Sequence, residues 1–71
     1  MNRIVHALVN GERRELADGT TVEALLRELG IVERNGIAVA VNEEVVPGAT
    51  FDRSALRDGD AVEIIRAAAG G

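Results

Sequence analysis

The residues best suited to chemistry stand at the end of the chain, in the run Arg66-Ala67-Ala68-Ala69-Gly70-Gly71. Residues 67–71 have only methyl groups or hydrogen as side chains, so they offer no apolar bulk to hold the segment against a core. Fully extended, the six residues after Ile65 would reach about 20 Å. The α-carboxylate of Gly71 would be ionised at neutral pH, and two glycines would let it enter a slot in which any Cβ would clash. We therefore expect residues 67–71 to form a flexible arm that presents its terminal carboxylate as a reactant.

Two other interpretations of the Gly-Gly end stay open at this point, a frayed terminus and the stub of a linker. The rest of the chain offers little competing chemistry. It has no cysteine, which excludes a disulfide, a thiolate metal site and a cysteine nucleophile. The single histidine, His6, cannot build a zinc site within one chain unless carboxylates supply the other ligands. No acid–base or nucleophile constellation can be assembled, so we expect no independent enzymatic activity, no bound metal and no bound cofactor.

Composition and charge limit the partners. The 71 residues make one small domain with a net charge of −4, and 46% of them are hydrophobic, as in a globular protein. The eight basic residues are all arginine and are scattered, and Phe51 is the only aromatic residue. Nucleic-acid binding needs a concentrated basic surface and is helped by stacking aromatics. The apolar run Ile4–Val9 is too short for a signal-peptide core or a membrane span. We expect a cytoplasmic protein that binds neither nucleic acid nor membrane.

The elements that would position the arm begin with a hairpin. Ile4–Val9 is rich in β-branched residues and predicts a strand. Asn10-Gly11 follows, and this dipeptide favours a type I′ turn, which needs positive φ at both central positions. Glu12–Ala17 is the expected returning strand, more polar and therefore partly exposed.

A helix is predicted over Thr21–Leu29. Thr20 and Glu23 are spaced as a capping box, in which each side chain accepts a hydrogen bond from the backbone N–H of the other. Gly30 supplies a left-handed stop. The apolar residues recur at i, i+3, i+4 and i+7 and give a single buried face; they are Val22, Leu25, Leu26 and Leu29.

Three further strands are expected. Ile37–Val41 alternates large and small side chains, and the large ones would face the helix. Val45-Val46 is a short strand that the following proline ends, since proline cannot donate to a ladder. Gly48–Arg57 is expected to be irregular, with at most one 3₁₀ turn around Ser54, before a last strand at Ala61–Arg66.

The predicted order is strand, strand, helix, strand, short strand, strand. A hairpin, a crossing helix and further strands build an α+β fold, in which a mixed sheet of four to five strands curls around one main helix. The connection through the helix is long enough to permit a parallel pairing. This is the β-grasp, or ubiquitin-like, architecture. We expect residues 1–66 to form the β-grasp domain and residues 67–71 its flexible C-terminal tail.

A series of short motifs from Ala7 onward adds a family resemblance. They are Leu8-Val9-Asn10-Gly11, Thr21-Val22 with Leu25-Leu26 and Leu29, Ala38-Val39-Ala40-Val41-Asn42, Val45-Val46-Pro47, Leu56, Asp58-Gly59-Asp60, Val62-Glu63-Ile64 and Gly70-Gly71. In their order and spacing the chain resembles the ThiS family, the sulfur carriers of thiamine thiazole synthesis. It departs from the family at Gly48, where arginine is frequent, and at Ala67 and Ala68, which are smaller than the family's usual residues.

The resemblance implies that the carboxylate of Gly71 is the reactive group and that Gly70 must stay small. In the family, a ThiF-type adenylyltransferase consumes ATP to form an acyl-adenylate on the terminal glycine. A sulfur donor, a cysteine desulfurase or a sulfurtransferase, then displaces AMP and leaves a thiocarboxylate. Thiazole synthase takes that sulfur for the thiazole ring. The protein would thus be a sulfur-carrying co-substrate of partner enzymes, with no catalytic residue of its own.

Partners would bind the folded domain and so raise the effective concentration of the tail in their active sites. The exposed side of the sheet should then carry an apolar docking patch. The candidates are Ile65 and Val46, with Ala67, Ala68 and Ala69 of the tail. Burial of Ile65 and Val46 in the core is the alternative.

Other functions stay open. The small subunit of molybdopterin synthase is also a sulfur carrier that ends in Gly-Gly on this fold, and its partners would tell it apart. A ubiquitin-like protein modifier would form isopeptide conjugates, and a plain interaction module would keep its function without Gly70 and Gly71. An acyl carrier is disfavoured because Ser54 lies in Arg53-Ser54-Ala55 and not in an Asp-Ser-Leu context at a helix start.

Overall fold

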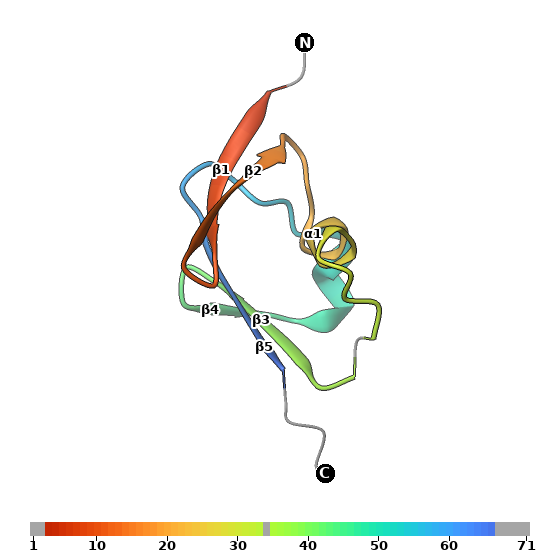
Figure 1. The fold of residues 1–71 in the computed structure, drawn as a ribbon. Coiled ribbons are helices and arrows are strands. Elements are labelled where there is room, and N and C mark those ends of the chain that lie inside the picture. Colours follow the sequence, from red (N-terminus) through yellow and green to blue (C-terminus); the bar gives the residue numbers. More distant parts are fainter. Residues whose placement is uncertain (1–2, 34, 67–71) are drawn as a thin grey trace.

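The computed structural model describes residues 3–33 and 35–66 (Figure 1). These residues form two strands, an α-helix, two more strands, a 3₁₀ helix and a final strand. The bounds are β1 Ile4–Val9, β2 Glu12–Ala17, α1 Val22–Glu28, β3 Ile37–Val41, β4 Glu44–Val46, η1 Gly48–Arg53 and β5 Ala61–Arg66. The predicted strands are confirmed, with one additional residue at the start of β4.

Within the described residues, the strands form a five-stranded sheet in the order β2-β1-β5-β3-β4. β1 and β5 are parallel neighbours in its middle, whereas the pairs β1–β2, β3–β5 and β3–β4 are antiparallel. The parallel pair therefore joins the first and last strands and not the strands on either side of the helix. α1 lies against one face of the sheet (Figure 1), which confirms the α+β, β-grasp arrangement.

The two hairpin turns share one backbone geometry. Asn10 has a φ of 51° and Gly11 a φ of 84°, as the predicted type I′ turn requires. The turn between β3 and β4 also has positive φ at both central residues, with 52° at Asn42 and 70° at Glu43. Glu43 therefore occupies a left-handed conformation that favours glycine.

α1 begins one residue later than the capping box predicts. Thr21 is the N-cap, and its hydroxyl oxygen accepts a hydrogen bond from the backbone N–H of Ala24 at 3.1 Å. Thr20 is buried and donates its hydroxyl hydrogen to the carbonyl of Ala17 at 2.6 Å. The predicted pairing of Thr20 with Glu23 is therefore wrong. The sequence gives no basis for choosing which of the two adjacent threonines is the N-cap. The burial of Thr20 leaves this role to Thr21.

α1 ends in a Schellman motif. Gly30 has a φ of 78°, and its N–H donates to the carbonyl of Arg27 at 3.0 Å. The N–H of Ile31 donates to the carbonyl of Leu26 at 2.8 Å, and Ile31 packs against the core. The predicted stop at Gly30 is confirmed. No helix in the described part of the chain is long and apolar enough to cross a membrane.

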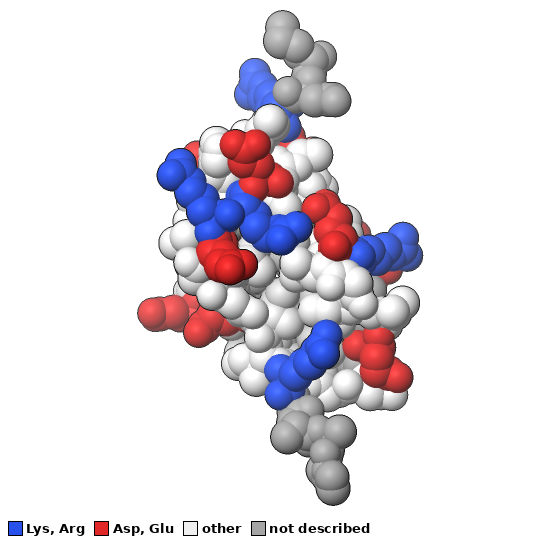
Figure 2. Space-filling model, viewed as in Figure 1, with Lys and Arg blue, Asp and Glu red and all other residues white. Residues whose placement is uncertain are grey.

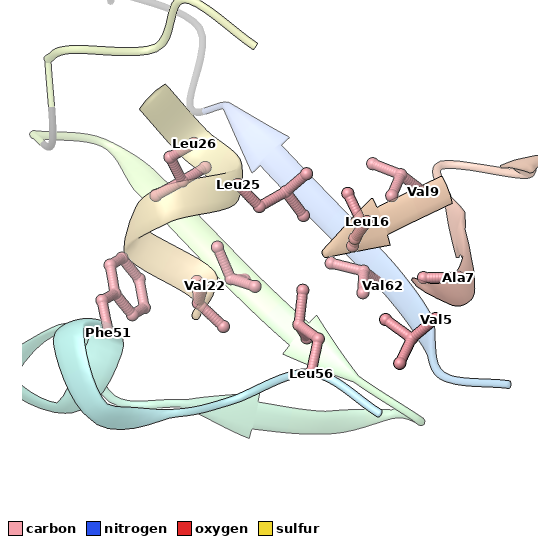
Figure 3. Close-up of a cluster of buried hydrophobic side chains, with 11 residues drawn as sticks. Val5, Ala7, Val9, Leu16, Val22, Leu25, Leu26, Phe51, Leu56 and Val62 are labelled. Carbon is pink, nitrogen blue, oxygen red and sulfur yellow. The ribbon is translucent and has the colours of Figure 1, made fainter. Parts of the chain in front are cut away.

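The core fills the space between α1 and the inner face of the sheet (Figure 3). Its largest fully buried side chains are aliphatic, and Leu25 and Leu26 of α1 are wholly enclosed. On β3 the buried Val39 faces this core while Ala38 is exposed on the other face, as the alternation predicts. The buried hydrophobic residues are Val5, Ala7, Val9, Leu16, Val22, Leu25, Leu26, Val39, Phe51, Leu56 and Val62.

The segment between β4 and β5 is more regular than expected. Gly48–Arg53 forms a 3₁₀ helix, whereas the sequence predicts one turn around Ser54, the residue at which this helix ends. The carbonyl of Ser54 accepts from the N–H of Val22 at 2.9 Å, and the N–H of Leu56 donates to the carbonyl of Thr20 at 2.8 Å. These bonds tie the segment to the start of α1.

Candidate functional site

β5 is the element that leads to the predicted reactive tail. It lies between β1 and β3 and ends at Arg66, where Ile37 of β3 is its partner. In Figure 1 the end of β5 and the start of β1 lie at opposite ends of the molecule. Residues 67–71 lie outside the described residues, so their flexibility and the roles expected of them stay predictions. These roles are the reactive carboxylate of Gly71, the small size of Gly70 and the docking contacts of Ala67, Ala68 and Ala69.

Two asparagine side chains hold β5 against its neighbours. In the β1–β2 turn, Oδ1 of Asn10 accepts from the N–H of Ile64 at 2.8 Å. In the β3–β4 turn, Oδ1 of Asn42 accepts from the N–H of Ala61 at 3.0 Å, and its Nδ2 donates to Asp60 Oδ1 at 3.0 Å. The sequence identified Asn10 only as a turn residue. The task of its side chain depends on the parallel β1–β5 pairing, which no local pattern reveals.

The turn before β5 is tied to β1 through His6. The backbone N–H of His6 donates to Asp58 Oδ1 at 2.7 Å, and its carbonyl accepts from the N–H of Gly59 at 2.7 Å. The ring nitrogens lie 3.4 Å from Asp58 Oδ1 and 3.5 Å from Glu15 Oε2. The bond from the His6 backbone lowers the pKa of Asp58, and the His6 ring and Arg13 lower it further, against a smaller effect of desolvation. His6 thus has a structural place on a partly exposed surface.

Apolar surface lies next to the end of β5 on the outer face of the sheet, away from α1. Ile65 is 57% exposed and pairs with the exposed Ala38 of β3. Ala40 continues the row and pairs with Val45 of β4, which is 75% exposed. We call Ile65, Ala38, Ala40 and Val45 the outer patch. Ile65 therefore lies on the exposed side, as predicted, and its role in docking stays a prediction.

Val46 lies on the opposite face from Ile65. It pairs with the buried Val39 and packs against the core. Its predicted place on the exposed side of the sheet is therefore corrected, and the exposed valine of β4 is Val45. Neighbouring side chains of a strand point to opposite faces, and two adjacent valines show no alternation from which the outward one could be chosen.

A hollow of about 240 Å³ lies beside the end of β5. It is lined by the connection between α1 and β3, by Ile37 and by Arg66. Val62 and Ile64 of β5 point toward the core, so Arg66 lies on the same, inner side of the strand. The end of β5 thus has the outer patch on one side and this hollow on the other.

Charged side chains are mixed by sign over the face seen in Figure 2. Acidic and basic groups lie among one another there, and no large area of one sign forms. On α1, Arg27 and Glu23 pair at 3.3 Å across one turn. The visible face therefore offers no continuous basic track of the kind that binds a phosphate backbone.

The comparison with protein families takes in almost the whole fold. The model of the ThiS family matches residues 7–71, from the middle of β1 through Gly71. The chain belongs to the ThiS family. The match includes both glycines of the tail as well as the strands and helix that carry it.

Two relatives of this ThiS-family chain have a similar length. A sulfur carrier protein ThiS of Thermus thermophilus is 44% identical over 63 residues, which are 89% of this chain and 95% of that protein. A sulfur carrier protein ThiS of Escherichia coli is 33% identical over 64 residues, 90% of this chain and 96% of that protein.

A longer relative and a solved structure complete the comparison. A thiazole synthase of Paramagnetospirillum magneticum is 44% identical over 64 residues, but the chain spans only 19% of that protein's length. The crystal structure of the thiamine biosynthesis protein ThiS from Geobacter metallireducens superposes with a TM-score of 0.79 at 32% identity. It covers 94% of this chain and 100% of its own, so the β-grasp fold described above is that of a ThiS protein.

Proposed function

We propose that this chain is a sulfur carrier protein of thiamine biosynthesis that holds sulfur as a thiocarboxylate on Gly71. The general part of this function follows from membership of the ThiS family and from relatives of the same length that are sulfur carrier proteins. The thiocarboxylate is the finer part of the proposal. The family match through residue 71 supports it, because the match takes in the two glycines at which the chemistry would occur.

The proposed cycle begins with activation, because a carboxylate is a poor electrophile. An oxygen of the Gly71 carboxylate attacks the α-phosphorus of ATP, pyrophosphate leaves and an acyl-adenylate forms. Sulfur at the oxidation level of sulfide then attacks the acyl carbon and displaces AMP, which leaves the thiocarboxylate. When the sulfur passes to the thiazole precursor, the acyl carbon of Gly71 takes up an oxygen, either from the carbonyl group that the sulfur replaces or from water, and the carboxylate is restored.

In this cycle the chain is a co-substrate and its partners are the enzymes. We propose a ThiF-type adenylyltransferase for the activation and a cysteine desulfurase or sulfurtransferase as the sulfur donor. Such donors carry the sulfur as a persulfide, so a thiol must release it at the level of sulfide and is itself oxidised to a disulfide. Thiazole synthase is the proposed acceptor. The relative from Paramagnetospirillum magneticum supports this choice, because a protein named thiazole synthase contains a segment similar to 90% of this chain. When a carrier segment and an enzyme belong to one polypeptide, the link between them keeps the two at high effective concentration.

The proposed function is tested by intact mass. The chain is incubated with ATP, a ThiF-type adenylyltransferase and a sulfide source, and then fragmented from its C-terminus. The expected product is heavier by the difference between sulfur and oxygen, with the change confined to Gly71. An unchanged mass, in a reaction that converts another ThiS-family carrier, would contradict the proposal.

The requirement for a small residue at position 70 gives a second test. Gly70→Ala adds a methyl group next to the reacting carboxyl, and we expect kcat/KM for adenylation to fall at least about tenfold, or about 1.4 kcal/mol. Ala67→Ser, which enlarges a side chain farther from the carboxyl, is the matched control and should stay near the wild-type value. Thermal unfolding of both variants should match the wild type. Equal adenylation of Gly70→Ala and Ala67→Ser would defeat the steric argument.

A further inference from the structure

We propose that the end of β5 is a docking edge, at which the adenylyltransferase that acts on Gly71 adds a strand to the sheet and binds the tail through its backbone. This inference rests on the proposed function and adds the way in which the tail is recognised. It follows from the backbone groups that β5 leaves unpaired and from the chemistry of the residues that come after it.

β5 has a neighbour on both sides over only part of its length. On one side, the pairing with β1 ends where Val9 lies opposite Val62, and the Asn10 side chain extends the contact to the N–H of Ile64. On the other side, the pairing with β3 continues to Arg66. Figure 1 shows β5 running on past the β1–β2 turn to its end beside β3. The last residues of β5 are therefore the edge of the sheet on the β1 side.

The direction of the backbone groups follows from the bonds that β5 makes. The carbonyl of Ala61 accepts from Asn42 on the β3 side at 2.7 Å, and the N–H of Ile64 donates to Asn10 on the β1 side. Alternate residues of a strand point their N–H and C=O groups to alternate sides. The carbonyl of Ile64 and the N–H of Arg66 therefore face the side on which β1 has already ended.

These two groups are open to a partner strand. In residues 3–33 and 35–66, neither the Ile64 carbonyl nor the Arg66 N–H has a hydrogen-bond partner. An unpaired acceptor followed by an unpaired donor on an exposed strand edge is a template for the addition of another strand. Asn10 fixes the point at which this docking edge begins.

The composition of the tail supplies the second argument. Residues 67–71 carry no side chain larger than a methyl group. An enzyme that binds this segment therefore has little to recognise except its N–H and C=O groups and the terminal carboxylate. Strand addition binds an extended chain through those backbone groups. A pairing at Ile64 and Arg66 would fix the point at which the chain leaves the sheet toward the enzyme.

The surfaces beside the docking edge suit an added strand. On the outer face, Ile65 is exposed at this edge, and the rest of the outer patch lies on the other side of β5, over β3 and β4. On the inner face, the hollow of about 240 Å³ lies beside Arg66. Side chains of a strand point alternately to the two faces, so those of an added strand would reach one or the other of these surfaces.

The test uses a pair of substitutions at one position. Arg66→Pro removes the N–H from the docking edge and places the proline ring there, while the bonds to β3 come from Ile65 and stay intact. Arg66→Ala loses the same guanidinium and keeps the N–H. With the cognate ThiF-type adenylyltransferase and ATP, we expect the KM for the carrier to be about tenfold higher for Arg66→Pro than for Arg66→Ala, as for one lost hydrogen bond. Equal KM values for the two folded variants would overturn the proposal.

A measurement on the unaltered chain does not depend on the folding of a variant. The Arg66 amide should exchange its hydrogen more slowly when the chain is saturated with the adenylyltransferase, whereas amides on the free edge of β2 should not change. An unchanged Arg66 exchange rate would overturn the docking edge even if Arg66→Pro were impaired.

The proposed function and the docking edge can fail separately. If neither the wild type nor Arg66→Ala is adenylated, the proposed function fails and the docking edge with it. If both are adenylated and the Arg66 amide gains no protection, only the docking edge fails.

Discussion

Asn10 has two tasks that different substitutions separate. Its backbone adopts the positive φ of the β1–β2 turn, and its Oδ1 accepts from the N–H of Ile64. Asn10→Gly should keep the turn and lose the side-chain bond, so we expect the free energy of unfolding in urea to fall by about 1 kcal/mol. Asn10→Asp keeps an acceptor oxygen and should remain near the wild type. Equal stability of the two variants would show that the bond to Ile64 contributes nothing.

We expect Asp58 to make the stability of the fold sensitive to acid. Its pKa is lowered from 3.8, chiefly because its carboxylate accepts a hydrogen bond from the backbone N–H of His6. A carboxyl group whose pKa is lower in the folded state stabilises that state above the unfolded pKa, and the contribution is lost as the pH falls through the folded pKa. We therefore expect the carboxyl resonance of Asp58 to titrate in NMR with a midpoint below 3.8.

A pair of amide substitutions checks the same effect on stability. Asp58→Asn keeps an acceptor oxygen at every pH, so it should lose less stability below pH 3.8 than the wild type does. Asp52→Asn makes the same change in net charge at an exposed site on η1, and it should lose as much stability at low pH as the wild type does. A midpoint for Asp58 at or above 3.8, or identical acid unfolding of the two variants, would contradict the assignment.

At the scale of elements, the β3–β4 hairpin forms with an unfavourable residue in its turn. Glu43 has a φ of 70°, and the left-handed region costs a residue with a Cβ about 1 kcal/mol or more. Glu43→Gly would create Asn-Gly, the preferred pair for a type I′ turn, and we expect the free energy of unfolding to rise by about 1 kcal/mol. Glu44→Gly, one residue later in β4, is the control and should lower it. Thermal unfolding measures both changes, and a Glu43→Gly variant that is no more stable than the wild type would contradict the strain.

The elements that could be predicted are those with local signals. The hairpin was predictable from a β-branched run and Asn10-Gly11, and the end of α1 from Gly30, because each signal acts within a few residues. The start of α1 could not be placed, since it depends on which of two threonines the fold buries. The outward face of β4 could not be placed either, because it depends on the register with β3. The parallel β1–β5 pair joins residues far apart in the chain, so no local pattern indicates it.

In the candidate site, too, some features could be predicted from the sequence and others could not. Composition alone pointed to residues 67–71, because side-chain size is read directly from the sequence. Ile65 was one candidate for the exposed side, with burial in the core as the alternative, because Ile64 and Ile65 are adjacent apolar residues like Val45 and Val46. The docking edge could not be predicted, because it depends on where β1 ends relative to β5. It also depends on the Asn10 side chain, which accepts a hydrogen bond from the N–H of Ile64 beyond the end of β1.

At the scale of the whole molecule, the outer face of the sheet is uneven. The outer patch covers β5, β3 and β4, whereas on β1 and β2 the exposed Ile4 and Leu8 lie on either side of His6, which is next to Glu15. If the patch docks partners, Ile65→Ser should raise the KM for adenylation about tenfold, a large part of the transfer energy of one aliphatic side chain. Its stability should change by less than about 0.5 kcal/mol, as at other exposed sites.

A control for this prediction lies at the other end of the molecule. Ile4 is 56% exposed at the start of β1, so Ile4→Ser removes similar apolar surface far from the end of β5. It should leave the KM unchanged. Equal effects of Ile65→Ser and Ile4→Ser would show that the outer patch has no special part in binding.

The central, parallel placement of β1 and β5 also has a mechanical consequence. A partner that draws the tail inward pulls on β5 along its axis, while the start of β1 lies at the opposite end of the molecule. If the domain is held at the start of β1, such a force is a shear, which loads the bonds between the two strands together, whereas force across a hairpin would break its bonds one at a time. The β1–β5 pair would therefore resist tension along β5 with all of its hydrogen bonds at once.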